Sequence, residues 1–134
     1  DYRSSRGLGD VYKRQHLPSV ALYQMGTGFT WDTQDRESDI AAAKRTWEHA
    51  LEMLTDVSYD LVVLDELTYM LAFDYLPESE VINALTGRPE SQSVVVTGRG
   101  GGQALREAMD TVSEVKEIKH AYRAGIRARQ GVDY

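Results

Sequence analysis

The chain has 134 residues, of which 42% are hydrophobic and 27% are charged, and its net charge is −6. This length and composition predict one globular domain, and the negative charge argues against nucleic acid or an anionic membrane as a partner. The absence of cysteine excludes disulfides, thiolate metal sites and cysteine nucleophiles, and no apolar run reaches the ~20 residues of a membrane-spanning helix.

The first fifteen residues, DYRSSRGLGDVYKRQ, differ from the rest of the chain: they are basic, contain glycine and have no hydrophobic period. We interpret them as a foreign segment of the kind that a translated vector or adapter join leaves, with a flexible native arm as the alternative. The predicted organisation is therefore a foreign or disordered segment at 1–16 and a single, incomplete α/β domain at 17–134.

Strands and helices are predicted to alternate along residues 17–134. A short β-branched and aromatic run at 19–25 predicts a strand, and apolar residues at helical spacing over 36–55 predict one long helix. The apolar runs at 61–66 and 93–97 are continuous rather than alternating, which is typical of strands buried on both faces of a parallel sheet. Further predicted elements are helices at 67–76, 77–85, 103–109 and 121–130 and a strand at 111–118.

This order predicts an α/β fold, with a parallel sheet, flanking helices and right-handed crossovers. Ligands in open parallel sheets bind at the carboxyl ends of the strands. The predicted strands bring three segments to that edge: the loop from Gly26 to Trp31, the acidic pair Asp65-Glu66, and the segment Thr97–Gly100.

The stretch VVLDE at 62–66 has the form of a Walker B strand, which presents a carboxylate to Mg²⁺ beside phosphate oxygens. The alternative is a buried strand whose acidic end simply meets water. In VVVTGRG, Thr97 offers a hydroxyl and Arg99 a bidentate phosphate donor, and the alternative is a glycine turn with a solvated arginine. The phosphate loop that accompanies a Walker B strand, G-x-x-x-x-G-K-[ST], is absent from the sequence, which predicts an N-terminal truncation.

Two large rings, Phe29 and Trp31, lie in a loop that Gly26 and Gly28 loosen, where no helical or strand period explains them. The rings either serve a ligand or plug a small hydrophobic space beneath the loop. Trp47, by contrast, lies at helical spacing and is predicted to belong to the core. The three histidines show no metal-ligand spacing and are assigned structural roles.

Several segments together resemble the P-loop family of ATP:corrinoid adenosyltransferases: MGTGFTWDTQDRESD, DLVVLDELTYMLAFDYLPESEVINAL, VVVTGRGGG and DTVSEVKEIKHAYRAGIRARQGVDY. The resemblance covers residues 17–134, and TGFTW with LDELTYM and GVDY is more specific than any single motif. It implies a RecA-like P-loop fold that lacks its N-terminal phosphate-loop unit, in a cytoplasmic homodimer. It also implies transfer of the 5′-deoxyadenosyl group of ATP to the cobalt of a reduced corrinoid, with Mg²⁺ at the triphosphate and a flavodoxin-type protein as a candidate reductant.

By resemblance, Phe29 and Trp31 cover the lower face of the corrinoid, where they exclude axial ligands and so ease the reduction of cobalt. Glu66 is expected to hold Mg²⁺, with Asp65 as a further ligand or as a residue acting through water. The residues expected to contact substrate are Gly28, Thr30, Arg36, Thr97 and Arg99. Two alternatives stay open: a corrinoid- or nucleotide-binding module without turnover, and a different P-loop ATPase in which the acidic pair activates water.

Overall fold

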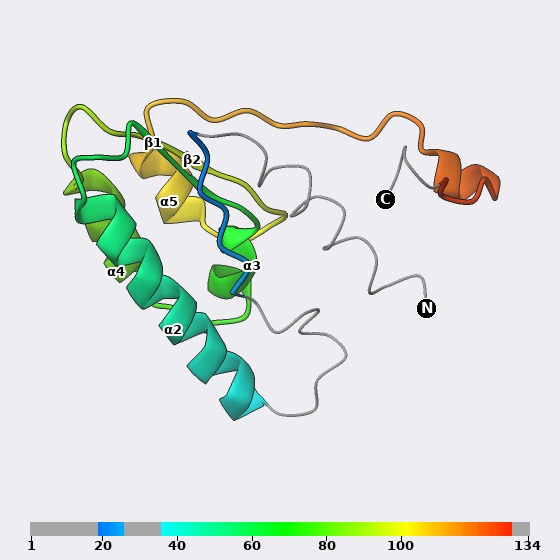
Figure 1. The fold of residues 1–134 in the computed structure, drawn as a ribbon. Coiled ribbons are helices and arrows are strands. Elements are labelled where there is room, and N and C mark those ends of the chain that lie inside the picture. Colours follow the sequence, from blue (N-terminus) through cyan, green and yellow to red (C-terminus); the bar gives the residue numbers. More distant parts are fainter. Residues whose placement is uncertain (1–18, 26–35, 130–134) are drawn as a thin grey trace. The chain divides into compact units, whose positions relative to one another are not determined.

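The structure is a computed structural model that describes residues 19–25 and 36–129 (Figure 1). The chain divides into two compact units, and each is described by itself. One unit comprises Asp1–Gln24 with Ser113–Tyr134, and the other, larger unit comprises Met25–Val112.

The larger unit contains a parallel pair of strands. Strand β1 (Leu61–Leu64) pairs with β2 (Ser93–Val96), with Leu61 opposite Ser93 and Leu64 opposite Val96. Both strands are shorter than predicted but lie inside the predicted runs. The parallel pairing confirms the predicted α/β class at this level, because parallel neighbours need a crossover connection between them.

Four predicted helices are present around this pair of strands (Figure 1). Their bounds are α2 (Arg36–Thr55), α3 (Leu67–Ala72), α4 (Glu78–Thr86) and α5 (Gln103–Ala108). The crossover from β1 to β2 carries α3 and α4, while α2 precedes β1 and α5 follows β2. None of the helices in the described parts of the chain combines the length and the apolar character that a membrane span requires.

Helix α2 has the predicted bounds, and its sequence explains them. Glu37 and Asp39 lie in the first turn, where unpaired backbone N–H groups favour negative charge. Trp47 is only 3% exposed, which confirms the prediction that it belongs to the core. Its indole N–H donates to the Glu80 carboxylate of α4 at 2.9 Å, and Figure 1 shows α2 and α4 side by side.

The hydrophobic core lies against one face of the β1–β2 pair. Val62 and Leu64 of β1 are buried in it, whereas Leu61 and Val63 on the opposite face are 51% and 54% exposed. The prediction that the strands are buried on both faces is therefore wrong for the described chain, since a continuous apolar run does not specify what covers the second face. The helical members of the core are Trp47, Ala50, Leu54, Leu67, Leu71, Val81, Leu85 and Leu105.

The helix predicted at 67–76 ends early, at Ala72. Asp74 adopts a left-handed conformation (φ 55°), and the Tyr75 N–H returns to the Met70 carbonyl at 2.8 Å, so the chain turns instead of continuing the helix. Pro77 then precedes α4 as its N-cap rather than forming its first residue. Proline is suited to this position because its fixed φ and missing N–H oppose helix continuation but not helix initiation.

The strands predicted at 19–25 and 111–118 are wrong for the described chain, which is irregular over both ranges. A strand needs a hydrogen-bonding partner, and Val115 and Ile118 are 97% and 87% exposed. The helix predicted at 121–130 is reduced to one 3-10 turn, η2 (Ala121–Ala124), in which no residue is buried. Periodicity alone does not hold a short helix together in water, because most of its stability comes from packing an apolar face.

Gln92 joins the end of α2 to the start of β1. Its side chain is 1% exposed, and its amide Nε2 donates to the carbonyls of Met53, Asp56 and Tyr59 at 3.1, 3.1 and 3.3 Å. The two hydrogens of one buried amide therefore serve three carbonyls, that of Met53 in α2 and those of Asp56 and Tyr59 in the loop that follows. None of the side chains of residues 56–60 is both polar and buried, so the loop itself cannot replace the Gln92 amide.

We expect Gln92→Met to lower the free energy of unfolding by about 0.5–1.5 kcal/mol, because methionine keeps the length of the side chain but removes the amide that joins the Met53, Asp56 and Tyr59 carbonyls. Equilibrium urea unfolding measures the change. Gln103→Met is the matched control, since Gln103 is exposed and bonds only within its own helix, to Glu107 at 3.2 Å. Equal unfolding midpoints for the two variants would contradict the role of Gln92.

Candidate functional site

The candidate site begins where β1 and β2 end. The side chains of a strand alternate between its two faces, and the register that pairs Leu64 with Val96 places Asp65 opposite Thr97 at the next step. The Thr97 N–H donates to the Leu64 carbonyl at 3.1 Å, which extends the ladder by one bond. The Thr97 hydroxyl donates to Asp65 Oδ1 at 2.5 Å. The two strand ends are therefore joined through side chains as well as backbone.

Glu66 makes the turn from β1 into α3. It has a left-handed backbone (φ 59°, ψ 18°) and serves as the N-cap of α3, a conformation that costs a non-glycine residue on the order of 1–3 kcal/mol. Its N–H donates to Thr97 Oγ1 at 2.9 Å, and its carbonyl accepts the Tyr69 N–H at 3.1 Å. These bonds on both sides of the residue hold the turn and direct the exposed Glu66 side chain away from the core.

The glycine-rich segment after β2 packs directly against α3. A Cβ on Gly98, at φ 155°, would overlap the Thr68 side chain, and a Cβ on Gly101 would lie 2.8 Å from the Thr68 carbonyl. Contact with the first turn of α3 is thus the structural reason for glycine at both positions. The approach of a ligand to this backbone stays a prediction.

Two predicted basic residues have different surroundings. Arg99 is exposed two residues beyond Thr97, and none of the described residues bonds to its guanidinium. Arg36 donates to the Phe73 carbonyl at 3.0 Å and lies over the Tyr75 ring at 5.3 Å. Arg36 therefore anchors the start of α2 to the turn between α3 and α4, while its predicted contact with substrate is untested.

The four residues predicted in the aromatic loop, Gly28, Phe29, Thr30 and Trp31, lie outside the described residues. The structure thus brings together Asp65, Glu66 and Thr97 at one edge of the sheet, with Arg99 in the same connection. The hydrogen bonds of the Thr97 hydroxyl were not foreseen from the sequence. The signal for them was present, since Asp65 and Thr97 each follow the last residue of a parallel strand.

The chemistry of this edge fits a hard divalent cation. Within the described residues, no cluster of three or more His, Asp or Glu side chains is placed to enclose a metal. Two adjacent, exposed carboxylates are present instead. Mg²⁺ is commonly held by one or two carboxylates plus phosphate oxygens and water, without a complete protein cage. Asp65 and Glu66 therefore suit a metal that arrives with a phosphorylated ligand.

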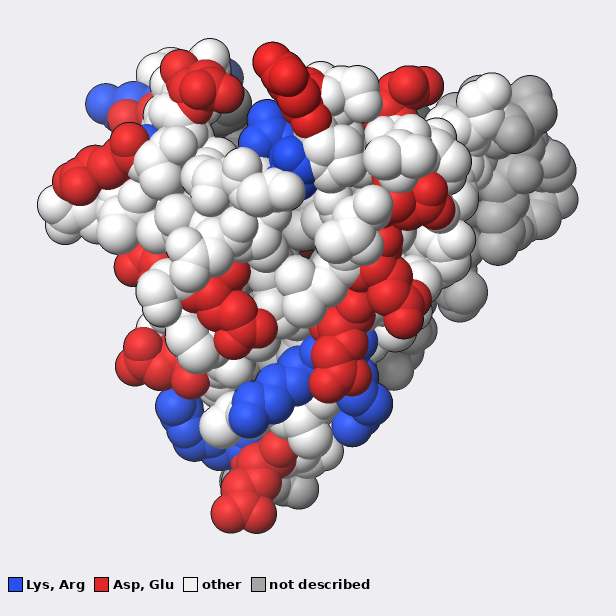
Figure 2. Space-filling model, turned by 90° about the vertical axis from the view of Figure 1, so that its left-hand side faces the viewer, with Lys and Arg blue, Asp and Glu red and all other residues white. Residues whose placement is uncertain are grey.

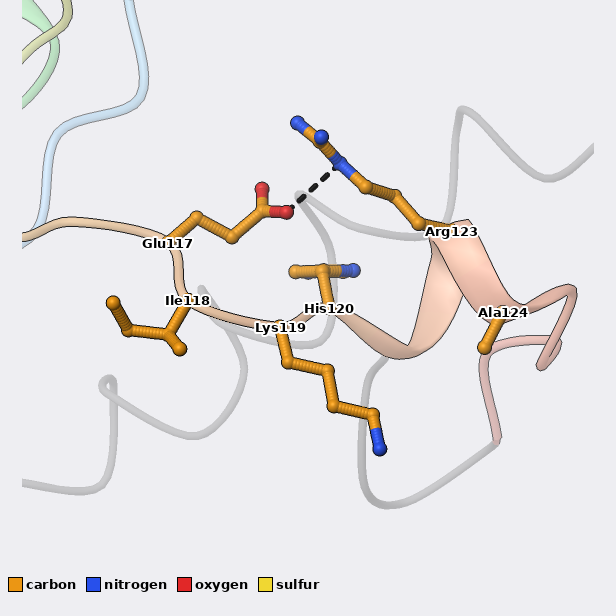
Figure 3. A pocket seen from close by; sticks show the side chains of 6 residues that line it. All are labelled: Glu117, Ile118, Lys119, His120, Arg123 and Ala124. Carbon is orange, nitrogen blue, oxygen red and sulfur yellow. Dashed lines mark ion pairs between the residues drawn. The ribbon is translucent and has the colours of Figure 1, made fainter.

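The smaller unit has a pocket at residues 117–124. Its lining residues are Glu117, Ile118, Lys119, His120, Arg123 and Ala124 (Figure 3). Arg123 Nε lies 2.8 Å from Glu117 Oε1, but the two side chains are 78% and 42% exposed, so the pair contributes little stability. His120 Nδ1 accepts the Tyr122 N–H at 3.1 Å, which caps η2 and accounts for this histidine structurally.

The surface charge agrees with the negative net charge. On the face in Figure 2, Asp and Glu side chains are spread over the surface, whereas Lys and Arg gather mainly near its lower end. A broad basic surface of the kind that binds nucleic acid is not visible on that face.

Open parallel α/β sheets as a class bind ligands at the carboxyl ends of their strands, and the carboxylates of this unit lie at that edge. Comparison with known proteins narrows the class. The family model for ATP:corrinoid adenosyltransferase BtuR/CobO/CobP matches residues 3–134. The chain belongs to this family. The predicted boundary between a foreign segment at 1–16 and a domain at 17–134 stays a prediction.

Several curated relatives are named corrinoid adenosyltransferases. The chain is 57% identical over 115 residues to a corrinoid adenosyltransferase of Escherichia coli K12, which covers 86% of this chain and 59% of that protein. It is 54% identical to corrinoid adenosyltransferase CobA of Salmonella typhimurium LT2 over the same shares. It is 45% identical to a corrinoid adenosyltransferase of Pseudomonas aeruginosa over 93% of this chain and 62% of that one. The chain therefore spans about three fifths of these relatives.

Proposed function

We propose that the protein to which this chain belongs transfers the 5′-deoxyadenosyl group of ATP to the cobalt of a reduced corrinoid. In this reaction cobalt(I) is the nucleophile, the cobalt–carbon bond forms at C5′, the C5′–oxygen bond breaks, and triphosphate leaves. The observation that carries the proposal is the identity of 57% with a protein named corrinoid adenosyltransferase. The carboxylates at the end of β1 support it independently.

Because the substrate supplies the nucleophile, the protein needs to position ATP and neutralise the leaving group. We assign Glu66 as the residue that holds Mg²⁺ at the triphosphate, with Asp65 beside it as a ligand or through water. Bound Mg²⁺ would neutralise charge on the phosphates. The exposed Arg99 is assigned to the phosphates because guanidinium groups pair with phosphate oxygens bidentately, and Arg36 is assigned to the substrate side of α2.

We assign Phe29 and Trp31 to the lower face of the corrinoid, with Gly28 and Thr30 as the backbone that lets the macrocycle approach. An axial donor makes cobalt(II) harder to reduce, and axial ligation is a principal control of a metal's potential. Two apolar rings would exclude the corrinoid's own base and water from that position. This role separates the proposed enzyme from an ATPase, which has no use for such a wall.

The phosphate loop is the part of the proposal that the chain does not contain. The motif G-x-x-x-x-G-K-[ST] does not occur in the 134 residues, while the relatives are longer than the segment they share with this chain. We propose that the full-length protein has a RecA-like P-loop fold and that the missing loop lies in its remaining part. Helices of the remaining part would cover the sheet face that carries the exposed Leu61 and Val63.

We further propose a homodimer, a flavodoxin-type reductant and a cytoplasmic location. The location follows from the proposed substrates, because ATP and reducing proteins are supplied there. The oligomeric state and the reductant are implied by family membership, and size-exclusion chromatography and reduction assays test them.

The test uses the protein translated from the complete gene. With ATP, Mg²⁺ and chemically reduced cobalamin, the account expects a light-sensitive alkylcobalamin and one triphosphate for each corrinoid consumed. Release of orthophosphate without an alkylated corrinoid would instead identify a P-loop ATPase. Tight binding of ATP and corrinoid without product would identify a binding module.

A further inference from the structure

The Thr97 hydroxyl makes hydrogen bonds to both acidic residues of the described site, one as donor and one as acceptor. It accepts the Glu66 N–H at 2.9 Å and donates to Asp65 Oδ1 at 2.5 Å. A hydroxyl has one hydrogen and two acceptor positions. Donation to Asp65 together with acceptance from Glu66 therefore fixes the orientation of the hydroxyl.

Thr97 is itself held from both sides. Its N–H bonds to the Leu64 carbonyl at 3.1 Å, and the next residue, Gly98, packs against Thr68 so closely that no Cβ fits. The hydroxyl is thus fixed relative to both β1 and α3. Thr97 is itself exposed, so these bonds, rather than burial, hold its hydroxyl toward the two partners.

The bonds leave the ligand-facing oxygens available. Asp65 Oδ1 is bound to Thr97, and none of the described residues bonds to Asp65 Oδ2 or to the Glu66 carboxylate. Both acids are exposed, so a ligand can reach them. Glu66 is directed outward by its left-handed turn (φ 59°), and the bond from its N–H to Thr97 helps to hold that turn.

We propose that Thr97 is a positioning residue: its hydroxyl orients the Asp65 carboxylate and stabilises the turn at Glu66, so that both acids face the divalent cation of a metal–nucleotide complex. The inference rests on the proposed function for the identity of the ligand. Thr97 was expected to contact the substrate directly; in this proposal it acts on the substrate only through Asp65 and Glu66. Residues that orient metal-binding carboxylates typically change metal affinity by about 10- to 100-fold when mutated.

The test measures Mn²⁺ binding to the full-length protein in the presence of the ATP analogue AMP-PNP, by the loss of the free-Mn²⁺ EPR signal beyond the loss that the same AMP-PNP causes without protein. Thr97→Val keeps the shape and removes the hydroxyl, and we expect it to raise the dissociation constant of Mn²⁺ by about tenfold. Thr97→Ser restores the hydroxyl and should stay within about twofold of the unmodified protein.

Thr55→Val is the matched control. The Thr55 hydroxyl is exposed in the last turn of α2 and donates to the Leu51 and Glu52 carbonyls of its own helix at 3.0 Å, so its removal should leave Mn²⁺ binding unchanged. Thermal unfolding of each variant shows that it is folded. In adenosyl transfer, Thr97→Val should raise the Mg²⁺ concentration for half-maximal rate, whereas Thr55→Val should not.

The outcomes separate the inference from the function. Normal Mn²⁺ binding by folded Thr97→Val, or binding by Thr97→Ser as weak as by Thr97→Val, overturns the positioning role while the enzyme activity stands. Failure of the unmodified full-length protein to bind Mn²⁺ with AMP-PNP overturns the positioning role. Failure to transfer adenosyl with metal bound overturns only the proposed function.

Discussion

Glu66→Gln in the full-length protein is expected to raise the Mg²⁺ concentration for half-maximal adenosyl transfer by at least about tenfold, and to lower the rate at limiting Mg²⁺ by about 10- to 100-fold. Glutamine keeps the size of the side chain and its outward position, but it removes the charge that a hard cation prefers. Because Glu66 is exposed and its turn is held through its own N–H and carbonyl rather than its side chain, the substitution should leave the fold intact. A Mg²⁺ titration of initial rates measures the effect.

Glu90→Gln is the matched control for that titration. Glu90 is an exposed acid that precedes β2, at the end of the sheet opposite to the candidate site. The same change of charge there should leave the metal requirement as it is. An unchanged titration for Glu66→Gln, or an equal shift for Glu90→Gln, would reject the assignment of Glu66.

The second large effect is expected at the aromatic loop. Phe29→Ala and Trp31→Ala should each lower adenosyl transfer from cob(II)alamin by about tenfold or more, which corresponds to at least about 1.4 kcal/mol of barrier. With a ring removed, water or the corrinoid's base can stay on cobalt, and the one-electron reduction becomes harder. Steady-state rates with a coupled reductant, at saturating ATP, provide the measurement.

ATP affinity serves as the internal control for the aromatic variants. The proposed wall acts on cobalt and not on the nucleotide, so the dissociation constant for ATP should change by less than about twofold, while the rate falls. Activity equal to that of the unmodified protein would rule out the wall. An equal loss of ATP affinity and rate would point to a general structural role for the two rings.

Local patterns in the sequence predicted the elements that are stabilised within one segment or by segments close to it in the chain. Helix α2 was predicted with its observed bounds, because acids mark its first turn and apolar residues at helical spacing mark the face that packs on the core. The parallel pairing of β1 and β2 followed from two apolar runs separated by helices. These features depend on side-chain spacing, which is visible in the sequence.

The predicted strand at 111–118 failed for the opposite reason. Its β-branched residues indicate a strand, but strand formation depends on an edge with which to pair, and Val115 is 97% exposed in the described structure. Leu61 and Val63 show a related limit. Their apolar side chains indicate a covered sheet face, but both are exposed in the described structure. The pattern of a segment indicates which of its side chains can be buried. It does not indicate which other segment of the fold will bury them or pair with the backbone.

The sequence predicted which residues make up the candidate site, but not the hydrogen bonds that join them. Asp65, Glu66 and Thr97 were placed at one sheet edge by the rule for parallel strands, and the structure brings them together there. The left-handed turn at Glu66 was not predicted, because glutamate has no preference for that conformation. It is imposed by the bonds to Thr97 and Tyr69, which only the three-dimensional arrangement reveals.

The central claim is that the protein prepares cobalt for attack on ATP by removing its lower axial ligand. The most direct measurement is the EPR spectrum of cob(II)alamin bound to the full-length protein with ATP and Mg²⁺. The account predicts a four-coordinate cobalt(II) species without the nitrogen hyperfine splitting of an axial base. A spectrum that contains only five-coordinate cobalt(II), with ATP and corrinoid both bound, would contradict it.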